Sequence, residues 1–321
     1  MTYHNFPDYI TATDIAKKIK IENLSSLPQI IISIAPVRSG TTATLRLYAE
    51  SGIKSYRQPF KSIYRQLAQG LDSNSNLPGW TIPDDDCIYV KETLGPHNIH
   101  ESLLNPIDIL FHVFKNALTG QYSDKALTSK VIEIMQSKLH LVIMGRDPVE
   151  SWCSNLETYN KLVDRNDLRS DPYYASSEEA LLENFIIAYQ QVEYIRQQAE
   201  NLCIPIHYYV YDANKYPEKA FTELFKKLKI NVMPKVSGWT TDSLIDGNNP
   251  NIFMISDFDN QKKAKLHEKL DQSDGIHYFY RKTDQVSSET KNMINRSGLY
   301  SIYKKWCVET EKDLDISLCK N

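Results

Sequence analysis

One turn in the chain combines an arginine, a glycine and three hydroxyl side chains. It follows the apolar run IIISIA (30–35) and precedes the amphipathic run TATLRLYAE (42–50), so the order is strand, turn, helix. The first turn of a helix offers unpaired N–H groups and positive partial charge, which bind phosphate-like anions. We therefore expect an anion to bind here, held by a planar guanidinium and several hydroxyl donors. The residues concerned are Arg38, Ser39, Gly40, Thr41 and Thr42.

This turn differs from the standard phosphate-binding loop, G-x-x-x-x-G-K-[ST]. Thr41 occupies the position of the lysine, and Ala35 occupies that of the first glycine. The missing lysine argues against an ATP-dependent kinase, although Thr42 still places a hydroxyl where such loops bind magnesium. A kinase or other nucleotide phosphotransferase is therefore kept as an alternative function.

A second stretch, LHLVIMGRDPVESWCSN (139–155), repeats this arrangement about a hundred residues later. A buried strand is expected to end at Gly145, and Pro148 opens a helix at a position that proline favours. Arg146 leaves the strand and Ser154 lies within the first turns of the helix, so the two side chains can bracket one dianion. The alternative is a structural arginine paired with Asp147 or another carboxylate.

Residues 38–42, RSGTT, resemble the 5′-phosphosulfate loop P-[KR]-S-G-T-[TS]-W of sulfotransferases that use 3′-phosphoadenosine-5′-phosphosulfate (PAPS). Two positions depart from that pattern. Val37 separates the proline from the arginine, and Ala43 stands where many members carry a tryptophan that stacks on adenine. The resemblance implies that Arg38, Ser39, Gly40, Thr41 and Thr42 contact the 5′ end of PAPS.

The second stretch resembles the 3′-phosphate site of the same family, R-[DN]-P followed by a serine, with Arg146 and Ser154 at the matching positions. The resemblance also implies that Tyr211 lies near the adenine, although Asp212-Ala213 replaces the family's Glu-Asp-Leu. It further implies that a late basic loop containing Arg281 and Lys282 covers the 3′-phosphate, although Thr283 replaces the glycine expected there.

The strand 87–92 is expected to carry the catalytic groups. The resemblance places a lysine and a histidine or glutamate at the end of this strand. Glu92 is then the first candidate for the general base that deprotonates the acceptor, with His97 and His100 as alternatives. Lys91 would hold the transferring sulfuryl oxygens. Adjacent strand residues face opposite ways, so Lys91 and Glu92 can share a site only if the strand has ended.

Other roles follow from the same resemblance. Arg38 would neutralise the bridging and leaving oxygens, and no metal is required. The segment 56–67 would approach the acceptor, with Gln58, Phe60, and also Arg57, lining its pocket. The implied activity is PAPS-dependent transfer of a sulfuryl group to a hydroxyl or amine of a small molecule. A non-catalytic nucleotide-binding protein of the same fold is a further alternative. The sequence leaves open the acceptor, the choice of base and the oligomeric state.

Short apolar runs alternate with longer helical patterns along the chain. This alternation predicts an α/β fold of three layers with a mostly parallel central sheet and extra helical insertions, forming one domain over residues 1–321. Strands are expected at 29–35, 87–92, 139–145 and 204–211. Helices are expected at 41–51, 59–69, 106–118, 124–138, 148–163, 177–201 and 215–228.

Composition excludes several classes of protein. The 321 residues carry a formal net charge of -3, which is unlike a general nucleic-acid binder. The five cysteines are scattered and form no C-x-x-C pair, so neither a disulfide framework nor a zinc site is expected. There is no secretory signal pattern and no apolar run of the roughly 20 residues that cross a membrane. We expect a soluble, cytoplasmic protein that acts on a small molecule.

Overall fold

A six-stranded, wholly parallel sheet forms the centre of the molecule in the computed structural model, which describes residues 10–68, 79–96, 98–164, 177–239, 249–255 and 273–318. The strand order is β7-β6-β2-β5-β3-β8. The bounds are β2 Gln29–Pro36, β3 Lys54–Arg57, β5 Cys87–Leu94, β6 Leu139–Gly145, β7 Ile206–Val210 and β8 Ile252–Phe253. A separate parallel pair joins β1 Ile19–Ile21 and β4 Trp80–Ile82.

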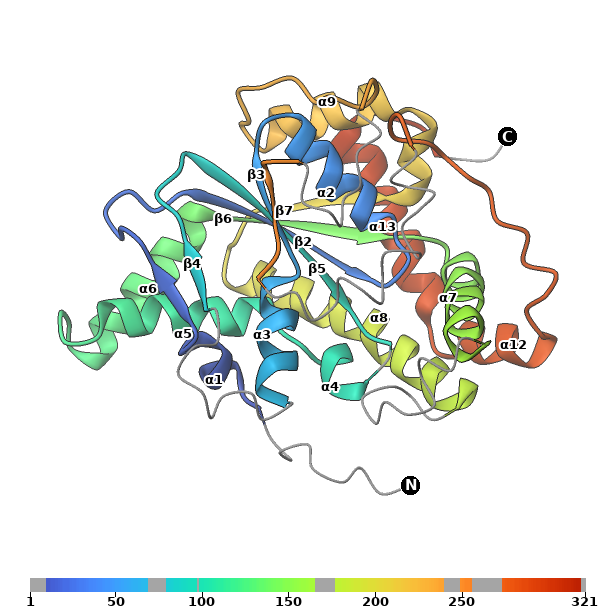
Figure 1. Ribbon diagram of the computed structural model, residues 1–321, viewed down its shortest axis with the longest axis horizontal. Helices are drawn as coiled ribbons and strands as arrows, with labels where there is room; N and C mark the ends of the chain where they lie inside the picture. Colours follow the sequence, from blue (N-terminus) through green and yellow to red (C-terminus); the bar gives the residue numbers. More distant parts are fainter. Residues whose placement is uncertain are drawn as a thin grey trace.

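Helices cover both faces of this sheet (Figure 1), which confirms the predicted three-layer α/β architecture. One face carries α2 Thr41–Glu50 and α9 Pro217–Lys227. The other carries α3 Pro59–Ala68, α5 Pro106–Leu118, α6 Asp124–Lys138 and α8 Glu178–Asn201. The remaining elements are α1 Ala12–Ala16, α4 Ile99–Ser102, α7 Pro148–Asp164, η2 Tyr211–Lys215, α12 Ser288–Arg296 and α13 Leu299–Leu314.

The central strands β2 and β6 are mainly apolar, as expected when both faces of a sheet are covered. Seven of the eight residues of β2 are buried, and β2 pairs with β5 on one side and β6 on the other. Below one face, α5 and α8 contribute Phe114 and Phe185 to a large apolar cluster. On the opposite face, Tyr48 of α2 stacks on Tyr89 of β5 with ring centroids 3.9 Å apart. Burial on both faces is typical of parallel sheets, whereas antiparallel sheets often have one face exposed to water.

The four expected strands and the seven expected helices are all present, with ends within two residues of those expected, and two differences are informative. β3 was not expected, because Lys54 and Arg57 at its ends are polar, yet Ser55 and Tyr56 between them are buried. β5 runs to Leu94, two residues beyond the expected end at 92. The helical insertions α5 and α6 lie between β5 and β6, as predicted, and the short helix α4 before them was not expected. The single-domain boundary 1–321 stays a prediction. Within the described residues, no helix combines the length and hydropathy needed to cross a bilayer.

Candidate active site

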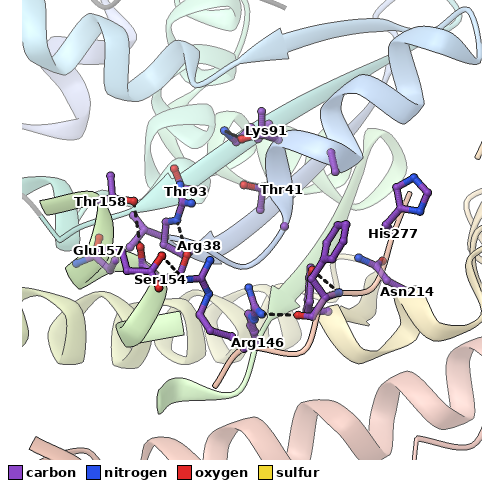
Figure 2. Close-up of a pocket in the computed structure, with 18 of the residues that line it drawn as sticks. Arg38, Thr41, Lys91, Thr93, Arg146, Ser154, Glu157, Thr158, Asn214 and His277 are labelled. Atoms are coloured by element: carbon purple, nitrogen blue, oxygen red, sulfur yellow. Dashed lines mark hydrogen bonds and ion pairs between the residues drawn. The ribbon is translucent and has the colours of Figure 1, made fainter. Parts of the chain in front are cut away.

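A cavity of about 990 Å³ opens at the carboxyl ends of the central strands (Figure 2), the edge where parallel α/β sheets bind ligands. Of the described side chains that line it, nine are lysine or arginine and only two, Glu157 and Asp274, are acidic. Such an excess of positive charge in a concave site attracts anions. The basic residues are Arg38, Arg57, Lys61, Arg65, Lys91, Arg146, Lys161, Arg281 and Lys282.

The turn between β2 and α2 has the backbone that close approach to a ligand requires. Gly40 is the N-cap of α2 and has φ +85°, in the left-handed region where glycine is favoured. A Cβ at this position would lie 2.9 Å from Cδ2 of Tyr211. Arg38 also has a positive φ of 67°, an unusual conformation for a side chain of its size. The N-terminus of the ten-residue helix α2 therefore opens into the cavity, with Arg38 and Thr41 beside it.

The two predicted anion-binding stretches meet in this cavity. Nε of Arg38 donates to Oγ of Ser154 on α7 at 3.0 Å, and Arg146 lines the same space (Figure 2). The hydroxyl of Ser151, one turn earlier on α7, donates to the carbonyl of Val37 at 2.8 Å. This bond ties α7 to the β2–α2 turn, so residues more than a hundred positions apart hold a common geometry.

Arg146 is buried and held from three sides. Its guanidinium lies 4.0 Å from the centre of the Tyr211 ring, a favourable cation–π arrangement. It also donates to Oε2 of Glu150 and to the carbonyl of Phe279, each at 3.0 Å. The sequence left open a structural arginine paired with a carboxylate. The structure has such a pair, with Glu150 rather than Asp147, and Arg146 lines the cavity as well.

Three arginines from distant segments repel one another in this site. The pKa of Arg38 is lowered to about 10, mainly by burial and then by the positive charges of Arg281 and Arg146. Arg38 remains charged at neutral pH, and the depression reflects the burial of its guanidinium together with repulsion by the other two cations. Arg281 is partly compensated by an ion pair with Glu157 of α7. An anion bound among the three guanidinium groups would relieve the repulsion.

Lys91 and Thr93 project from the same side of β5 into the cavity. Nζ of Lys91 donates to Oγ1 of Thr42 at 3.1 Å, so a lysine does reach the first turn of α2, although it comes from a neighbouring strand. Two residues further along, the hydroxyl of Thr93 accepts a 2.6 Å bond from Nε2 of Gln58. Both ends of this second bond line the cavity, and the predicted role of Gln58 in binding the acceptor stays a prediction.

The structure does not bring Glu92 into the cavity. β5 continues past this residue, so the strict alternation of a strand turns its side chain to the opposite face. Oε1 of Glu92 accepts a 2.8 Å bond from the backbone N–H of Phe60, and Oε2 has no hydrogen-bond partner among the described residues. Phe60 is likewise absent from the cavity lining, because its ring is fully buried in the core beside Trp80.

We expect Glu92→Gln to change how stability depends on pH. Burial raises the pKa of the Glu92 carboxyl from 4.5 to about 7, and the Lys61 ammonium only partly offsets this. Between these values the folded state keeps a proton that the unfolded state has lost, so stability falls as pH rises. As pH rises through this range, the free energy of unfolding of the unsubstituted protein should therefore fall relative to that of Glu92→Gln. The total fall should be at most about 3 kcal/mol. Urea unfolding at about pH 5, 6, 7 and 8 measures this difference. A difference that stays constant with pH would contradict the assignment.

The predicted histidine alternatives are also placed away from the site or lie outside the described residues. His100 is exposed on the short helix α4 and does not line the cavity. His97 falls outside the described part of the chain, so its role as a base stays a prediction. By contrast, Tyr211, Arg281 and Lys282 all line the cavity.

Two buried polar atoms near the turn have no hydrogen-bond partner within the described ranges. They are Oγ of Ser39, which is fully buried and does not line the cavity, and Nδ2 of Asn155, which borders the cavity. Buried polar groups are normally paired, so each calls for an explanation. A bound ligand with anionic oxygens would supply the acceptor that Nδ2 of Asn155 lacks, whereas the side chain of Ser39 is turned away from the cavity lining.

Sequence reasoning missed several lining residues. Glu157, Thr158 and Lys161 follow Ser154 at i+3, i+4 and i+7, and therefore share one face of α7. This spacing is readable in the sequence and would have found them. Asn214 in η2 and His277 in the segment before α12 also line the cavity (Figure 2). No local pattern marks those two, because they arrive from turns and extended chain.

No protein-family model matches the chain, and no curated protein matches it. A sulfotransferase domain is among the solved structures that do match. This domain, from the curacin biosynthetic pathway, is 16% identical with a TM-score of 0.41, and the match covers 85% of this chain and 98% of that one. Another match is retinol dehydratase in complex with androsterone and the inactive cofactor PAP. It is 12% identical with a TM-score of 0.35, and the match covers 90% of this chain and 82% of that one. Similarity at this level does not say which residues act or what they bind.

Proposed function

We propose that this chain is a PAPS-dependent sulfotransferase that transfers a sulfuryl group to a hydroxyl or amine of a small-molecule acceptor. One observation carries the proposal: Arg38, Arg146 and Arg281, from three distant segments, face a single cavity at the carboxyl edge of the sheet. Burial, and then repulsion by Arg281 and Arg146, lowers the pKa of Arg38, and a bound polyanion would offset both effects.

The arrangement suits a nucleotide that carries anionic groups at both its 5′ and 3′ positions. The first turn of α2 with Arg38 would hold the 5′ end, since that turn combines free N–H groups with a guanidinium. Arg146 and Ser154, with Arg281 and Lys282 over them, would hold the 3′-phosphate. Tyr211 would lie beside the adenine. β2 and β6 are neighbours in the sheet, so the two sites are adjacent, as one nucleotide requires.

An unpaired donor supports the fit of PAPS to this site. Asn155 lines the cavity and buries Nδ2 without a partner among the described residues, and this donor suits an acceptor oxygen. The cavity volume of about 990 Å³ lies at the upper end of the range for small-molecule sites, about 300–1,000 Å³, and leaves room for an acceptor as well.

PAPS, when bound, supplies a sulfuryl group attached to a phosphate that departs in the reaction. Sulfuryl transfer resembles phosphoryl transfer, in which positioning and electrostatic stabilisation provide most of the catalysis. Arg38 and Lys91 flank the first turn of α2 and would stabilise charge on the leaving oxygen and the equatorial oxygens. The paired side chains of Gln58 and Thr93 would orient the acceptor. His97 remains the proposed base from the sequence, because Glu92 and His100 do not line the cavity.

One contact favours a second candidate, a nucleotide phosphotransferase. Lys91 bonds Thr42 at 3.1 Å and so provides a cation near the position that the lysine of a standard phosphate-binding loop would occupy. Such an enzyme would not need the second arginine site at Arg146. The preference between the two candidates therefore depends on whether a 3′-phosphate contributes to binding.

Thermal unfolding with matched nucleotides tests the proposal. Adenosine 3′,5′-bisphosphate (PAP) at about 100 times its Kd should stabilise the protein by about 2.7 kcal/mol, which raises Tm by several degrees. Adenosine 5′-monophosphate lacks only the 3′-phosphate and should stabilise far less, as should ATP with magnesium. If ATP with magnesium ranks above PAP, the phosphotransferase candidate is preferred and the sulfotransferase proposal fails. Binding of PAP without transfer from labelled PAPS to any acceptor would indicate the non-catalytic alternative.

A further inference from the structure

We propose that Cys153 and Glu157 of α7 are positioning residues that hold a basic loop over the site of the 3′-phosphate. The basic loop is defined here as residues 279–285, which include Arg281 and Lys282. This inference rests on the proposed function and deepens it. It names two side chains on which selectivity for a 3′-phosphate depends, in addition to those that would contact the phosphate.

The basic loop has no regular structure of its own. It forms neither helix nor strand, and its aromatic residues Phe279 and Tyr280 are 67% and 61% exposed, so apolar burial of these rings does not hold it in place. Fixing the backbone of such a segment costs conformational entropy. The position of the loop over the cavity therefore depends on its polar contacts with neighbouring elements.

One end of the basic loop is held by the nucleotide site itself. The carbonyl of Phe279 accepts a 3.0 Å bond from Arg146, and its N–H donates to the hydroxyl of Tyr211 at 3.2 Å. These contacts fix residue 279, but the two cations follow two and three positions later. Arg281 and Lys282 both line the cavity, so further contacts are needed to set their direction.

The thiol of Cys153 holds the backbone at the second cation. Sγ of Cys153 donates to the carbonyl of Lys282 at 3.3 Å and accepts a bond from Nε2 of Gln285 at 2.8 Å. The cysteine is fully buried, and the next residue of α7, Ser154, accepts the bond from Arg38 (Figure 2). The same turn of α7 therefore sets the positions of the serine and of the basic loop.

The carboxylate of Glu157 holds the first cation. It forms an ion pair with the guanidinium of Arg281, and its Oε1 also accepts a bond from Nε2 of Gln285 at 3.2 Å. Burial opposes ionisation of Glu157, but the hydrogen bond and charge of Arg281 outweigh this and lower the pKa of the carboxyl. Glu157 lies one turn after Cys153, so both side chains lie on the face of α7 that contacts the loop.

Gln285 joins the two anchors at the far end of the loop. Its side-chain nitrogen donates to both Cys153 and Glu157. The next residue, Val286, is 3% exposed, and its N–H donates to the carbonyl of Thr283 at 3.1 Å. The two cations thus lie between fixed points. Loss of either anchor should release them while leaving intact the first turn of α2, which would hold the 5′ end of the nucleotide.

The direction of one effect separates positioning from simple electrostatics. Glu157 is a carboxylate in a cavity proposed to bind a phosphate, so its charge alone would repel that phosphate. On that basis its removal should strengthen PAP binding. If Glu157 instead orients the guanidinium of Arg281, its removal should weaken PAP binding, because a mobile arginine loses conformational entropy when the phosphate binds. We expect the second result.

Titration calorimetry with PAP and adenosine 5′-monophosphate tests the inference. We expect Cys153→Ala to weaken PAP binding about fivefold and Glu157→Ala to weaken it about tenfold. The affinity for adenosine 5′-monophosphate, which lacks the 3′-phosphate, should change by less than about twofold. A merely structural role would instead lower both affinities alike, or lower only the stability.

Three further variants make this test specific. Cys153→Ser keeps a donor and an acceptor at the same position and should restore most of the PAP affinity. Cys203→Ala and Glu183→Ala, at exposed positions, are the matched controls and should change neither affinity. An unchanged ratio of the two affinities in either Cys153→Ala or Glu157→Ala would overturn the inference, as would tighter PAP binding by Glu157→Ala.

Limited digestion with trypsin provides a second measurement that needs no nucleotide. Trypsin cleaves after lysine and arginine, so Arg281 and Lys282 report whether the loop is anchored. We expect cleavage there to be at least about fivefold faster in Cys153→Ala and Glu157→Ala, with cleavage elsewhere unchanged. Unchanged cleavage in both variants would refute the anchoring. If PAP fails to bind the unsubstituted protein, the proposed function fails, whereas faster cleavage in the variants would still support the anchors.

Discussion

Replacing Arg146 with alanine is expected to weaken PAP binding by at least about 100-fold. The guanidinium is buried, lies over the Tyr211 ring and is held by Glu150 and the carbonyl of Phe279. A preorganised, desolvated arginine contributes about 2–5 kcal/mol to a charged contact, and each 1.4 kcal/mol corresponds to a tenfold change in Kd. Isothermal titration with PAP measures the loss. Adenosine 5′-monophosphate, which lacks the 3′-phosphate, should lose much less.

Arg146→Ala also leaves Glu150 without its buried partner, so the variant is expected to be less stable before any ligand is added. Arg146→Lys separates the two effects. It keeps the charge beside Glu150 but loses the planar fork and most of the stacking on Tyr211. We expect Arg146→Lys to fold with near-normal stability and still bind PAP at least about tenfold more weakly. Unchanged PAP affinity in both variants would remove Arg146 from the 3′-phosphate site.

Replacing Gly40 with alanine is expected to impair both folding and nucleotide binding. The residue has φ +85°, and a Cβ there would approach Cδ2 of Tyr211 to 2.9 Å. The ring cannot withdraw easily, because Arg146 lies on it and its hydroxyl accepts a bond from the N–H of Phe279. The left-handed backbone costs about 1–2 kcal/mol for a residue with a Cβ, and the contact adds to that cost. The turn should shift away from the ligand, so PAP affinity should fall by more than about tenfold.

Gly120→Ala is the matched control for this prediction. Gly120 has nearly the same backbone, with φ +84°, but a Cβ there would meet nothing within 4 Å. Its substitution should therefore cost only the backbone strain, about 1–2 kcal/mol, and leave PAP binding unchanged. Urea unfolding and titration calorimetry on the two variants measure both quantities. Equal destabilisation, with PAP affinity preserved in Gly40→Ala, would show that the close packing of the turn on Tyr211 is unimportant.

Local pattern was sufficient for the parts of the site that lie within one strand-turn-helix unit. The apolar run of β2, the glycine at position 40 and the first turn of α2 are contiguous, and their backbone conformations follow from their own residues. The same holds for β6, Arg146 and Pro148 at the start of α7. In such units the hydrogen bonds and the burial pattern are set by neighbours in the chain, so the sequence predicts them directly.

Strand pairing decided the face on which each residue of β5 lies. The sequence ended this strand at Glu92, which allowed Lys91 and Glu92 to share a site. In the structure, β5 pairs with β2 up to Leu94, and the extra residues keep the alternation that directs Lys91 and Thr93 into the cavity. The length of a strand depends on its partners, which are distant in the sequence. The same long-range packing placed the ring of Phe60 in the core rather than in the cavity.

The amino-acid sequence by itself therefore determined the α/β class, the position of most elements and the two turns that present arginines at strand ends, because each depends on short-range periodicity. Only the tertiary structure decided that β2 lies between β5 and β6, so that Lys91 reaches Thr42 while Arg38 reaches Ser154. It also decided that the cations of β3 and α3 form a separate wall of the same cavity. Strand order depends on which buried faces pack together across the whole chain, and no local pattern records that choice.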